Sequence, residues 1–460
     1  MNVNGVVVVS LRSLRRVGVL ATVVAVLSLP MAAGVASAAP AALDPAAVDT
    51  AAGANGGLCS LPVLSRLCPP KTVVLDGNRL LLNRLALLAG DRTTRTALSD
   101  LLKQADVAVN AGPWTVVDKE RVPPSGDKHD YLSLAPYWWP SKPKTPDNPL
   151  GCPYVQRDGV LNPETTAVPD KAERLKAFSA IYQLSLAWYY TGKPAYAQRA
   201  ALDLRTWFLD PATKMNPNLN FAQGIPCKND GRGIGIIEFS YTFTQVLDAA
   251  AILSTGAPSW TKGDEAAFKG WSGDFLTWLR TSQYGKDEAA AKNNHGTFMD
   301  MLTAGTALYT GQPAVAKDIL AQAKVVRIDH QIAADGSQPE EVARTRTYHY
   351  STFNLVALTR LAQIGRHVGV DLWGYTNPAG GSIVKAVDFL LPAATGGAAN
   401  WHYPDLNFTQ YAALDSVHAA ADAGDRQARA ALSHVPAPPG GDLYPVRPAA
   451  EQLDDISTTG

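Results

Sequence analysis

Apolar residues recur at intervals of three and four positions along most of this chain, a spacing that places them on one face of an α-helix. The alternation of apolar and polar positions that is typical of β-strands is scarce. The pattern therefore predicts an all-α protein. The expected helices span residues 78–90, 94–109, 170–191, 194–208, 234–254, 263–280, 296–309, 313–325, 351–367, 381–391 and 408–422.

One short sequence occurs twice between expected helices, as YTGKPA at residues 190–195 and YTGQPA at residues 309–314. In each copy a glycine follows one helix and a proline begins the next, which are the positions that these two residues prefer. The two segments are therefore expected to be equivalent helical hairpins. Stacked hairpins of this kind predict an incomplete α/α toroid.

Residues 122–169 depart from the helical pattern, because they contain many prolines, few helix-forming residues and a dense group of aromatic residues. A connection of this length within a compact domain usually has a function. We expect it to form a long aromatic-rich loop over a cleft.

The two ends of the chain differ from the helical body. Residues 1–38 have the features of a signal peptide, with Arg12, Arg15 and Arg16 before the apolar run 17–29 and small residues at the expected cleavage site. An uncleaved membrane anchor is the alternative, but the apolar run is short for a bilayer span. We expect a secreted or periplasmic protein that begins at Ala39. Residues 39–70 then form an alanine-rich lead, residues 71–433 the main domain and residues 434–460 a flexible tail.

The charge of the chain restricts its partners. The formal net charge of the 460 residues is zero and only 18% of them are charged. A nucleic-acid-binding surface and a polybasic membrane patch are therefore not expected, and the mature protein is expected to be a monomer. An anionic ligand would have to be bound by locally placed arginine and lysine residues.

Cys59, Cys68, Cys152 and Cys227 agree with an oxidising compartment. Sequence rules leave three pairings open. Local loop closure favours Cys59–Cys68, which leaves Cys152–Cys227 to join two long loops. A zinc site is disfavoured because the chain has no C-x-x-C pair and no histidine near the cysteines.

Two polar stretches carry the main candidate chemistry. The run Asn293-Asn294-His295 precedes an apolar helix, and taken alone it would be interpreted as a helix cap and a surface histidine. Residues 344–350 contain two arginines, two tyrosines and one histidine, a composition that suits a cleft for carboxylates. On a regular helix Arg344 shares a face with Tyr348. Arg344 can therefore reach Tyr350 only if the segment before the helix is irregular.

A third polar and aromatic group lies in the long loop. Exposed aromatic residues on a loop often contact sugar rings, and the alternative here is an aromatic cluster that anchors the loop. The residues are His129, Tyr131, Tyr137, Trp138 and Trp139.

These stretches resemble the alginate lyase family of polysaccharide lyases, whose catalytic domain is an α/α toroid. The resemblance covers about residues 127–366 and is most specific at the Asn-Asn-His run, at the Glu-x-Ala-Arg stretch that reaches His-Tyr, at the Tyr-Trp-Trp-Pro segment 137–140, at Asp158-Gly159 and at Asn-Pro-Glu 162–164. It implies that elimination is carried out by Asn294, His295, Arg344 and Tyr350. The spacing from arginine to tyrosine is one residue shorter than in the alginate-cleaving branch. Two of the segments look closer to relatives that act on other uronate polymers, such as glucuronan.

The implied reaction is β-elimination in a uronate polymer, without a metal or other cofactor. Asn294 and Arg344, with His295 nearby, would neutralise the carboxylate and stabilise the enolate-like charge. The phenolate of Tyr350 or neutral His295 would take the proton from carbon 5, and Tyr350 would protonate the leaving oxygen. Arg344 would favour ionisation of the phenol. Substrate contacts are expected from His129, Tyr131, Tyr137, Trp138, Trp139, Arg346, Tyr348 and His349.

Two other functions are compatible with the same architecture. An inverting glycoside hydrolase would need two carboxyl groups that flank the bond, and the candidates are Asp130, Glu238, Glu340 and Glu341. A secreted protein that binds a polysaccharide without cleaving it is the second alternative. The complete Asn, His, Arg and Tyr set argues against it, since binding alone would not require all four.

Overall fold

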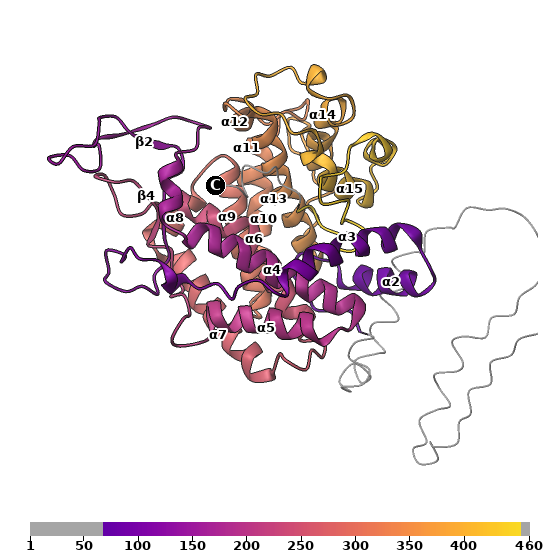
Figure 1. Ribbon diagram of the computed structural model, residues 1–460. Coiled ribbons are helices and arrows are strands. Elements are labelled where there is room, and N and C mark those ends of the chain that lie inside the picture. The colour runs from indigo at the N-terminus through magenta and orange to yellow at the C-terminus, as the bar shows by residue number, and fades with distance from the viewer. Residues whose placement is uncertain (1–67, 452–460) are drawn as a thin grey trace, which may run out of the picture. The chain divides into compact units, whose positions relative to one another are not determined.

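The computed structural model describes residues 68–451, and helices dominate this part of the chain (Figure 1). The predicted all-α class is therefore confirmed. The predicted signal peptide, most of the alanine-rich lead and Cys59 lie outside the described residues.

The helices begin and end close to the predicted positions, within a few residues in most cases. They are α2 (Gly77–Leu88), α3 (Arg92–Ala108), α4 (Asp170–Thr191), α5 (Pro194–Phe208), α6 (Ile237–Leu253), α7 (Lys262–Thr281), α8 (Gln283–Ala289), α9 (Asn294–Tyr309), α10 (Pro313–Ala323), α11 (Asp329–Gln331), α12 (Pro339–Val342), α13 (Thr347–Val368), α14 (Ile383–Gly396), α15 (Leu414–Asp422) and α16 (Arg426–Ala431). The sequence pattern missed α8, α11, α12 and α16, which are too short to show a helical period.

Successive helices form the predicted hairpins of an incomplete α/α toroid. The helix α4 packs against α5 and α6, α6 packs against α9, and α9 packs against α10 and α13. Figure 1 shows α5 and α7 outside α4 and α6. The inner helices are buried nearly all round, as apolar helices without a polar face must be.

Two inner helices illustrate this burial. In α13 every residue from Thr347 to Gly365 is buried. The segment Gly233–Leu253, which includes α6, is long and apolar enough to cross a membrane by composition, but 89% of its apolar window is buried inside the protein. Its apolar character is therefore explained by its central place in the helical core.

The repeated sequence forms equivalent junctions, as predicted. Gly192 ends α4 with a φ of 74°, and Pro194 is the first residue of α5. Gly311 has a φ of 79° between α9 and α10, and Pro313 is the first residue of α10. A left-handed glycine followed by a proline thus turns the chain from an inner helix to an outer helix in both copies.

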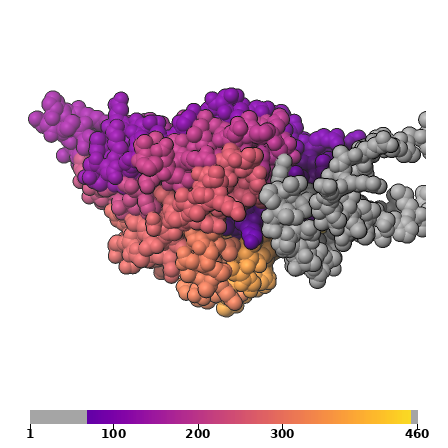
Figure 2. All heavy atoms as spheres, turned by 90° about the horizontal axis from the view of Figure 1, so that it is seen from below, coloured from indigo at the N-terminus to yellow at the C-terminus, as the bar shows by residue number. Residues whose placement is uncertain are grey.

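The few strands lie in the non-helical segments. Strand β1 (Leu132–Leu134) pairs in parallel with β4 (Phe221–Gly224), and β2 (Trp138–Pro140) pairs antiparallel with β3 (Tyr154–Gln156). The loop that joins β2 to β3 projects away from the helices in both views (Figures 1 and 2). The long loop predicted from the sequence therefore contains a β-hairpin, and turns connect it to the helices.

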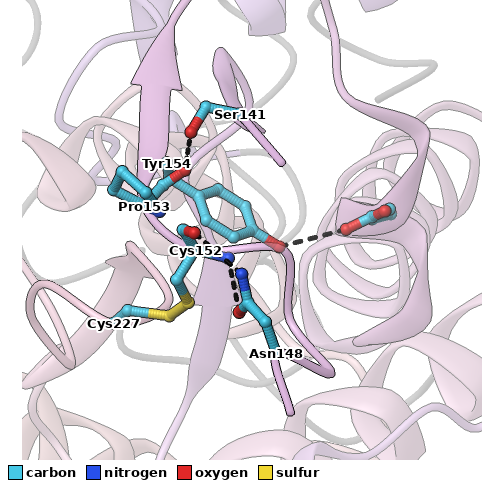
Figure 3. Close-up of a disulfide and its surroundings, with 7 residues drawn as sticks. Ser141, Asn148, Cys152, Pro153, Tyr154 and Cys227 are labelled. Carbon is cyan, nitrogen blue, oxygen red and sulfur yellow. Dashed lines mark hydrogen bonds between the residues drawn. A yellow bond between two sulfur atoms is a disulfide. The ribbon is translucent and has the colours of Figure 1, made fainter. Parts of the chain in front are cut away.

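A disulfide between Cys152 and Cys227 joins the β2–β3 hairpin to the loop that follows β4 (Figure 3). The Cα atoms of the two cysteines are 6.4 Å apart. On the hairpin side, the Asn148 amide donates to the Cys152 carbonyl and accepts from its N–H, both at 2.9 Å. The predicted Cys152–Cys227 disulfide is thus confirmed. The other predicted disulfide, Cys59–Cys68, stays a prediction because Cys59 lies outside the described residues.

The prediction of a flexible tail from residue 434 is wrong for the part that extends to Glu451. Tyr444 is 1% exposed, Arg447 forms an ion pair of 2.7 Å with Asp415, and the Tyr182 hydroxyl donates to Glu451 at 2.7 Å. The local composition, rich in proline and glycine, gave no sign of these contacts with α4 and α15, which are distant in the sequence.

Candidate active site

The inner helices and the irregular segments enclose a cavity with a volume of about 470 Å³, a size typical of ligand sites. The cavity is lined by the region from Pro136 to Leu161, the start of α4, the segment from β4 to the start of α6, and the starts of α9 and α13 with the residues just before them. All four residues that the family resemblance selected line it, namely Asn294, His295, Arg344 and Tyr350.

The start of α9 presents Asn294 and His295 to the cavity. The helix cap is Asn293, whose side chain accepts from the His295 N–H at 3.3 Å. Asn294 is the first helical residue and does not cap the helix. Its backbone N–H and its side-chain amide donate to the two carboxylate oxygens of Glu341, each at 2.6 Å. Glu341 thus fixes the orientation of the Asn294 amide.

Burial raises the pKa of Glu341 to about 7, against the opposing effect of the two hydrogen bonds from Asn294. The carboxyl group therefore changes its charge near neutral pH. Its ionised form has two acceptor oxygens for Asn294, whereas its protonated form has one good acceptor.

His295 is oriented by a second carboxylate. Its Nδ1 lies 2.7 Å from Oε1 of Glu288, which is fully buried in α8. An ionised glutamate at this position accepts a hydrogen bond from Nδ1–H, which places the lone pair of a neutral imidazole on Nε2. Nε2 can then accept a proton, and only after it has done so can it donate to a bound carboxylate.

Arg344 lies outside any regular helix. The short helix α12 ends at Val342, Arg346 has a non-helical backbone with a φ of −121° and a ψ of 69°, and α13 begins at Thr347. The condition that the sequence set for contact between Arg344 and Tyr350 is therefore met. Nη2 of Arg344 donates to the Tyr350 hydroxyl at 2.8 Å, and the guanidinium lies 3.8 Å from the centre of the tyrosine ring.

Asp158 holds the same guanidinium from the other side. Nη2 and Nε of Arg344 donate to its two oxygens at 2.7 and 3.3 Å. The neighbouring Gly159 has a φ of 74°, and a Cβ there would lie 2.5 Å from the Thr345 hydroxyl. Only glycine fits this close approach, so the Asp158-Gly159 pair anchors the hairpin region to the segment that carries Arg344.

Tyr350 is 6% exposed and its hydroxyl also lies 3.2 Å from that of Tyr137. Burial raises the pKa of the phenol, and Tyr137 adds to this effect, while Arg344 opposes it. The expectation that Arg344 favours ionisation is correct in direction, but burial outweighs it. The phenol therefore keeps its proton at neutral pH.

The structure divides the eight expected substrate-binding residues into two groups. Tyr137, Trp138, Arg346 and His349 line the cavity. The ring of Trp138 also carries Nζ of Lys228 at 4.3 Å from its centre, which fixes the indole beside the cavity.

The other four do not line the cavity, so their predicted roles are corrected. Tyr131 is a core residue with 0% exposure that donates to Glu238, and Tyr348 packs against Trp401 and Phe408 on the far side of α13. The predicted positions of these two side chains are wrong because the sequence does not show which face of each segment is turned inwards.

His129 and Trp139 have partners elsewhere. Nδ1 of His129 hydrogen-bonds to the Lys214 carbonyl, at 2.5 Å. The Trp139 indole donates to the Val160 carbonyl at 3.0 Å and lies under the Arg157 guanidinium. Both residues stabilise the long loop instead of lining the cavity.

The carboxylates proposed for a hydrolase have structural partners. Asp130 accepts from Ser125, Asn216 and Asn218, and Glu340 is exposed outside the cavity. Glu341 is bound to Asn294. Of the four candidates only Glu238 lines the cavity. The four candidates therefore give no pair of carboxyl groups within the cavity, and Asp158, the other carboxylate that lines it, is held by Arg344.

Sequence reasoning missed Lys171 and Gln223, which line the cavity, and Glu288, which orients His295 from behind it. They come from α8, α4 and the loop around β4, and no spacing in the sequence connects them with the Asn-Asn-His run. Among residues 68–451 no group of three or more His, Cys, Asp and Glu side chains is arranged to hold a metal ion.

Comparisons with known proteins identify the family of this chain. A family model described as alginate lyase matches residues 115–401. The crystal structure of an alginate lyase from Bacteroides ovatus is 32% identical, with a TM-score of 0.76, and the match covers 82% of this chain and 99% of that chain.

Two structures of alginate lyase A1-III variants in complex with a tetrasaccharide are 18% and 16% identical, each with a TM-score of 0.54, and the matches cover 84% of this chain and 98% of those chains. At this level of identity they support the fold alone. A search of curated proteins found no match.

Proposed function

Since the chain belongs to the alginate lyase family and is a polysaccharide lyase, we propose that it cleaves a polymer of uronic acids by β-elimination at the cavity between α9 and α13. The observation that carries this proposal is the meeting of Asn294, His295, Arg344 and Tyr350 in one cavity, although the two pairs are about 50 residues apart in the sequence.

The first requirement of the reaction is to neutralise the uronate carboxylate, because its charge opposes removal of the proton on carbon 5. Arg344 can supply a positive charge, the Asn294 amide can supply a hydrogen bond, and His295 can supply one when its Nε2 carries a proton. These groups are held by Asp158, Glu341 and Glu288 before substrate arrives. Preorganised donors of this kind stabilise developing negative charge at little reorganisation cost.

The second requirement is proton transfer at carbon 5 and at the leaving oxygen. Because burial raises its pKa, Tyr350 keeps its proton at neutral pH, which suits donation to the leaving oxygen. Two groups can act as the base. Nε2 of His295 is favoured by its bond to Glu288, and Tyr350 is favoured where the proton and the leaving oxygen lie on one face of the sugar, since one group then serves both steps.

The direct test is ultraviolet absorbance with a panel of alginate blocks, glucuronan and hyaluronan. A rise near about 235 nm, expected for the conjugated product of elimination, would support a lyase and identify its polymer. We expect the rate to be unchanged after treatment with a chelator, since the proposed steps use protein side chains alone. New reducing ends without this absorbance would contradict the proposal and indicate hydrolysis.

We also propose that the protein is exported, on the basis of the basic and apolar pattern of residues 1–38. The test is the N-terminal sequence of the protein recovered from outside the cytoplasm. A mature chain that begins at Ala39 would support export, and an intact N-terminus in the cytoplasm would contradict it.

A further inference from the structure

Four buried polar side chains form a hydrogen-bond network that the proposed chemical steps do not use. They are Thr297 of α9, Gln331 of α11, Gln338 just before α12 and Asn354 of α13, and each is at most 2% exposed. None of the four is among the residues that line the cavity in the described part of the chain. Buried polar groups cost free energy unless they bond one another, so a network of this kind has one well-defined geometry.

Asn354 is the centre of this network. Its Nδ2 donates to the side-chain oxygens of Gln331 and Gln338, at 3.0 and 2.7 Å. Its Oδ1 has no hydrogen-bond partner among residues 68–451. The two donations are thus the whole contribution of this amide to hydrogen bonding. Asn354 also lies one helical turn after Tyr350, so the two side chains are on the same side of α13.

The orientation of each amide in the network is fixed by its partners. Nε2 of Gln331 donates to the Asn293 carbonyl at 3.1 Å, and Nε2 of Gln338 donates to the Ser351 carbonyl at 3.0 Å. Both glutamines therefore present their oxygens to Asn354. A reversed Asn354 amide would place its oxygen against two other oxygens, so the donors and acceptors cannot be exchanged.

The contact through Gln331 reaches the peptide group between Asn293 and Asn294. Gln331 bonds the carbonyl of this peptide group, and Glu341 accepts from its N–H at 2.6 Å. Because a peptide group is planar, bonds at both of its ends fix its orientation. Thr297, in the next turn of α9, donates to the Gln331 oxygen at 2.8 Å. Gln331 therefore fixes the first residue of α9, which presents its amide to the cavity.

The contact through Gln338 reaches the segment that carries Glu341. The Gln338 carbonyl accepts from the Glu341 N–H at 2.9 Å, at the start of the short helix α12. The Gln338 side chain bonds Asn354 and the Ser351 carbonyl, which both belong to α13. Since Glu341 holds the Asn294 amide, both partners of that contact are connected to α13 through Asn354.

We propose that Asn354 is a positioning residue for β-elimination. It connects the start of α9 and the segment of Glu341 to α13, the helix that carries Tyr350. It thereby sets the distance between the two pairs of side chains that meet in the cavity, and it acts through Gln331 and Gln338 alone. This inference rests on the proposed function, since it concerns the rate of that reaction.

The first test compares Asn354→Leu and Gln331→Met with the unaltered protein in the ultraviolet assay. Each change nearly keeps the size of the side chain and removes its hydrogen bonds. We expect kcat to fall about 10- to 100-fold with KM nearly unchanged, because a small displacement of groups that act in the transition state lowers the rate more than it weakens binding. The double variant should lose no more than the worse single variant, since both changes act through one network.

Two kinetic outcomes would contradict the proposal. One is an unchanged kcat in either single variant, and the other is a pair of losses that multiply in the double variant. Gln331→Met decides the first point by itself if Asn354→Leu does not fold, as circular dichroism would verify.

The matched control is Tyr182→Phe, which removes a buried hydrogen bond to Glu451 from a position of α4 outside the cavity lining. It should lower the melting temperature, as the two test variants do, and leave kcat unchanged. The rates are measured below the temperature at which any of the variants begins to unfold. An equal loss of kcat in Tyr182→Phe would indicate a general effect of stability and overturn the proposal.

Hydrogen exchange, followed by mass spectrometry, separates this inference from the proposed function. In Asn354→Leu the backbone amides of residues 294–297 and 341–344 should exchange about tenfold faster, because both segments open locally when their connection to α13 is lost. Tyr182→Phe should not change them. If no polymer gave the ultraviolet signal, the proposed function would fail, and this comparison would still decide whether Asn354 holds the two segments. Unchanged exchange at either segment in Asn354→Leu would overturn that role.

Discussion

At the scale of single residues, the carboxylates of this site position other groups. Asp158, Glu288 and Glu341 each hold one of the polar side chains in the cavity, namely Arg344, His295 and Asn294. None of the three lies on the same element as the side chain that it holds. The chemistry is thus assigned to the amide, imidazole, guanidinium and phenol, and the carboxylates fix their geometry.

Replacement of Tyr350 by phenylalanine tests the assignment of the proton donor. The change should lower kcat about 10²–10⁴-fold, the usual contribution of a general acid or base, with a smaller effect on KM. Steady-state rates from the ultraviolet assay measure this. Tyr348→Phe is the matched control, since its hydroxyl donates to the Gln410 carbonyl away from the cavity. Full activity of Tyr350→Phe would refute the assignment.

The pKa of about 7 for Glu341 predicts a pH effect on activity. As the pH falls through 7, the carboxylate becomes protonated and loses one acceptor for Asn294, so kcat/KM should decrease on the acid side. Glu341→Gln should lower kcat/KM about tenfold or more and remove this acid limb, because glutamine does not titrate. A pH profile of the variant that still falls through 7 would assign the limb to another group.

At the scale of elements, part of the cavity wall is built by segments that are not helical. The β2–β3 hairpin contributes Trp138 and Gln156, and β4 with the loop after it contributes Gln223 and Arg232. The hairpin is too short to be stable alone, since its two strands have three residues each and bury little surface. The connection of the hairpin to the loop after β4 by Cys152–Cys227, seen in Figure 3, holds two walls of the cavity together.

Removal of this disulfide should affect both stability and substrate binding. The cysteines are 75 positions apart in the sequence, so the chain-entropy model predicts a loss of about 4 kcal/mol in the free energy of unfolding of the double serine variant. KM should also rise because both connected loops line the cavity. Denaturant unfolding and steady-state kinetics measure the two effects. An unchanged KM would show that the helices alone fix these loops.

At the scale of the whole molecule, several buried acidic groups connect stability with pH. Burial raises the pKa of Glu341 and Asp203 to about 7 and that of Asp170 to about 6. Values near 4 apply to the unfolded chain. The folded state therefore binds more protons between these values, and the stability from these groups is full below pH 4 and lost as the pH rises through 6 to 7.

The melting temperature should accordingly be higher at pH 5.5 than at pH 8, by a few degrees. Asp264 does not reverse this trend, because its pKa of about 2 confines its effect to lower pH. Differential scanning calorimetry at constant ionic strength is the measurement, and Glu341→Gln should reduce the difference. A higher melting temperature at pH 8 would contradict the prediction.

The helical periods of the sequence determined the main helices, the repeated Gly-x-Pro junctions and the all-α class, because these depend on interactions between near neighbours. The motifs and their resemblance to a family also selected Asn294, His295, Arg344 and Tyr350, which meet in the cavity. The order of the residues was sufficient for these features.

Only the tertiary structure decided which face of each segment is turned inwards. It placed Tyr348 and Tyr131 in the core and Tyr350 in the cavity, brought Glu288 to His295 and Lys171 and Arg232 to the same cavity, and packed the chain up to Glu451. These outcomes depend on contacts between residues that are distant in the sequence and on burial, which sets the pKa values of the site. Local spacing in the sequence determines neither the long-range contacts nor the burial, so these features could not be predicted from it.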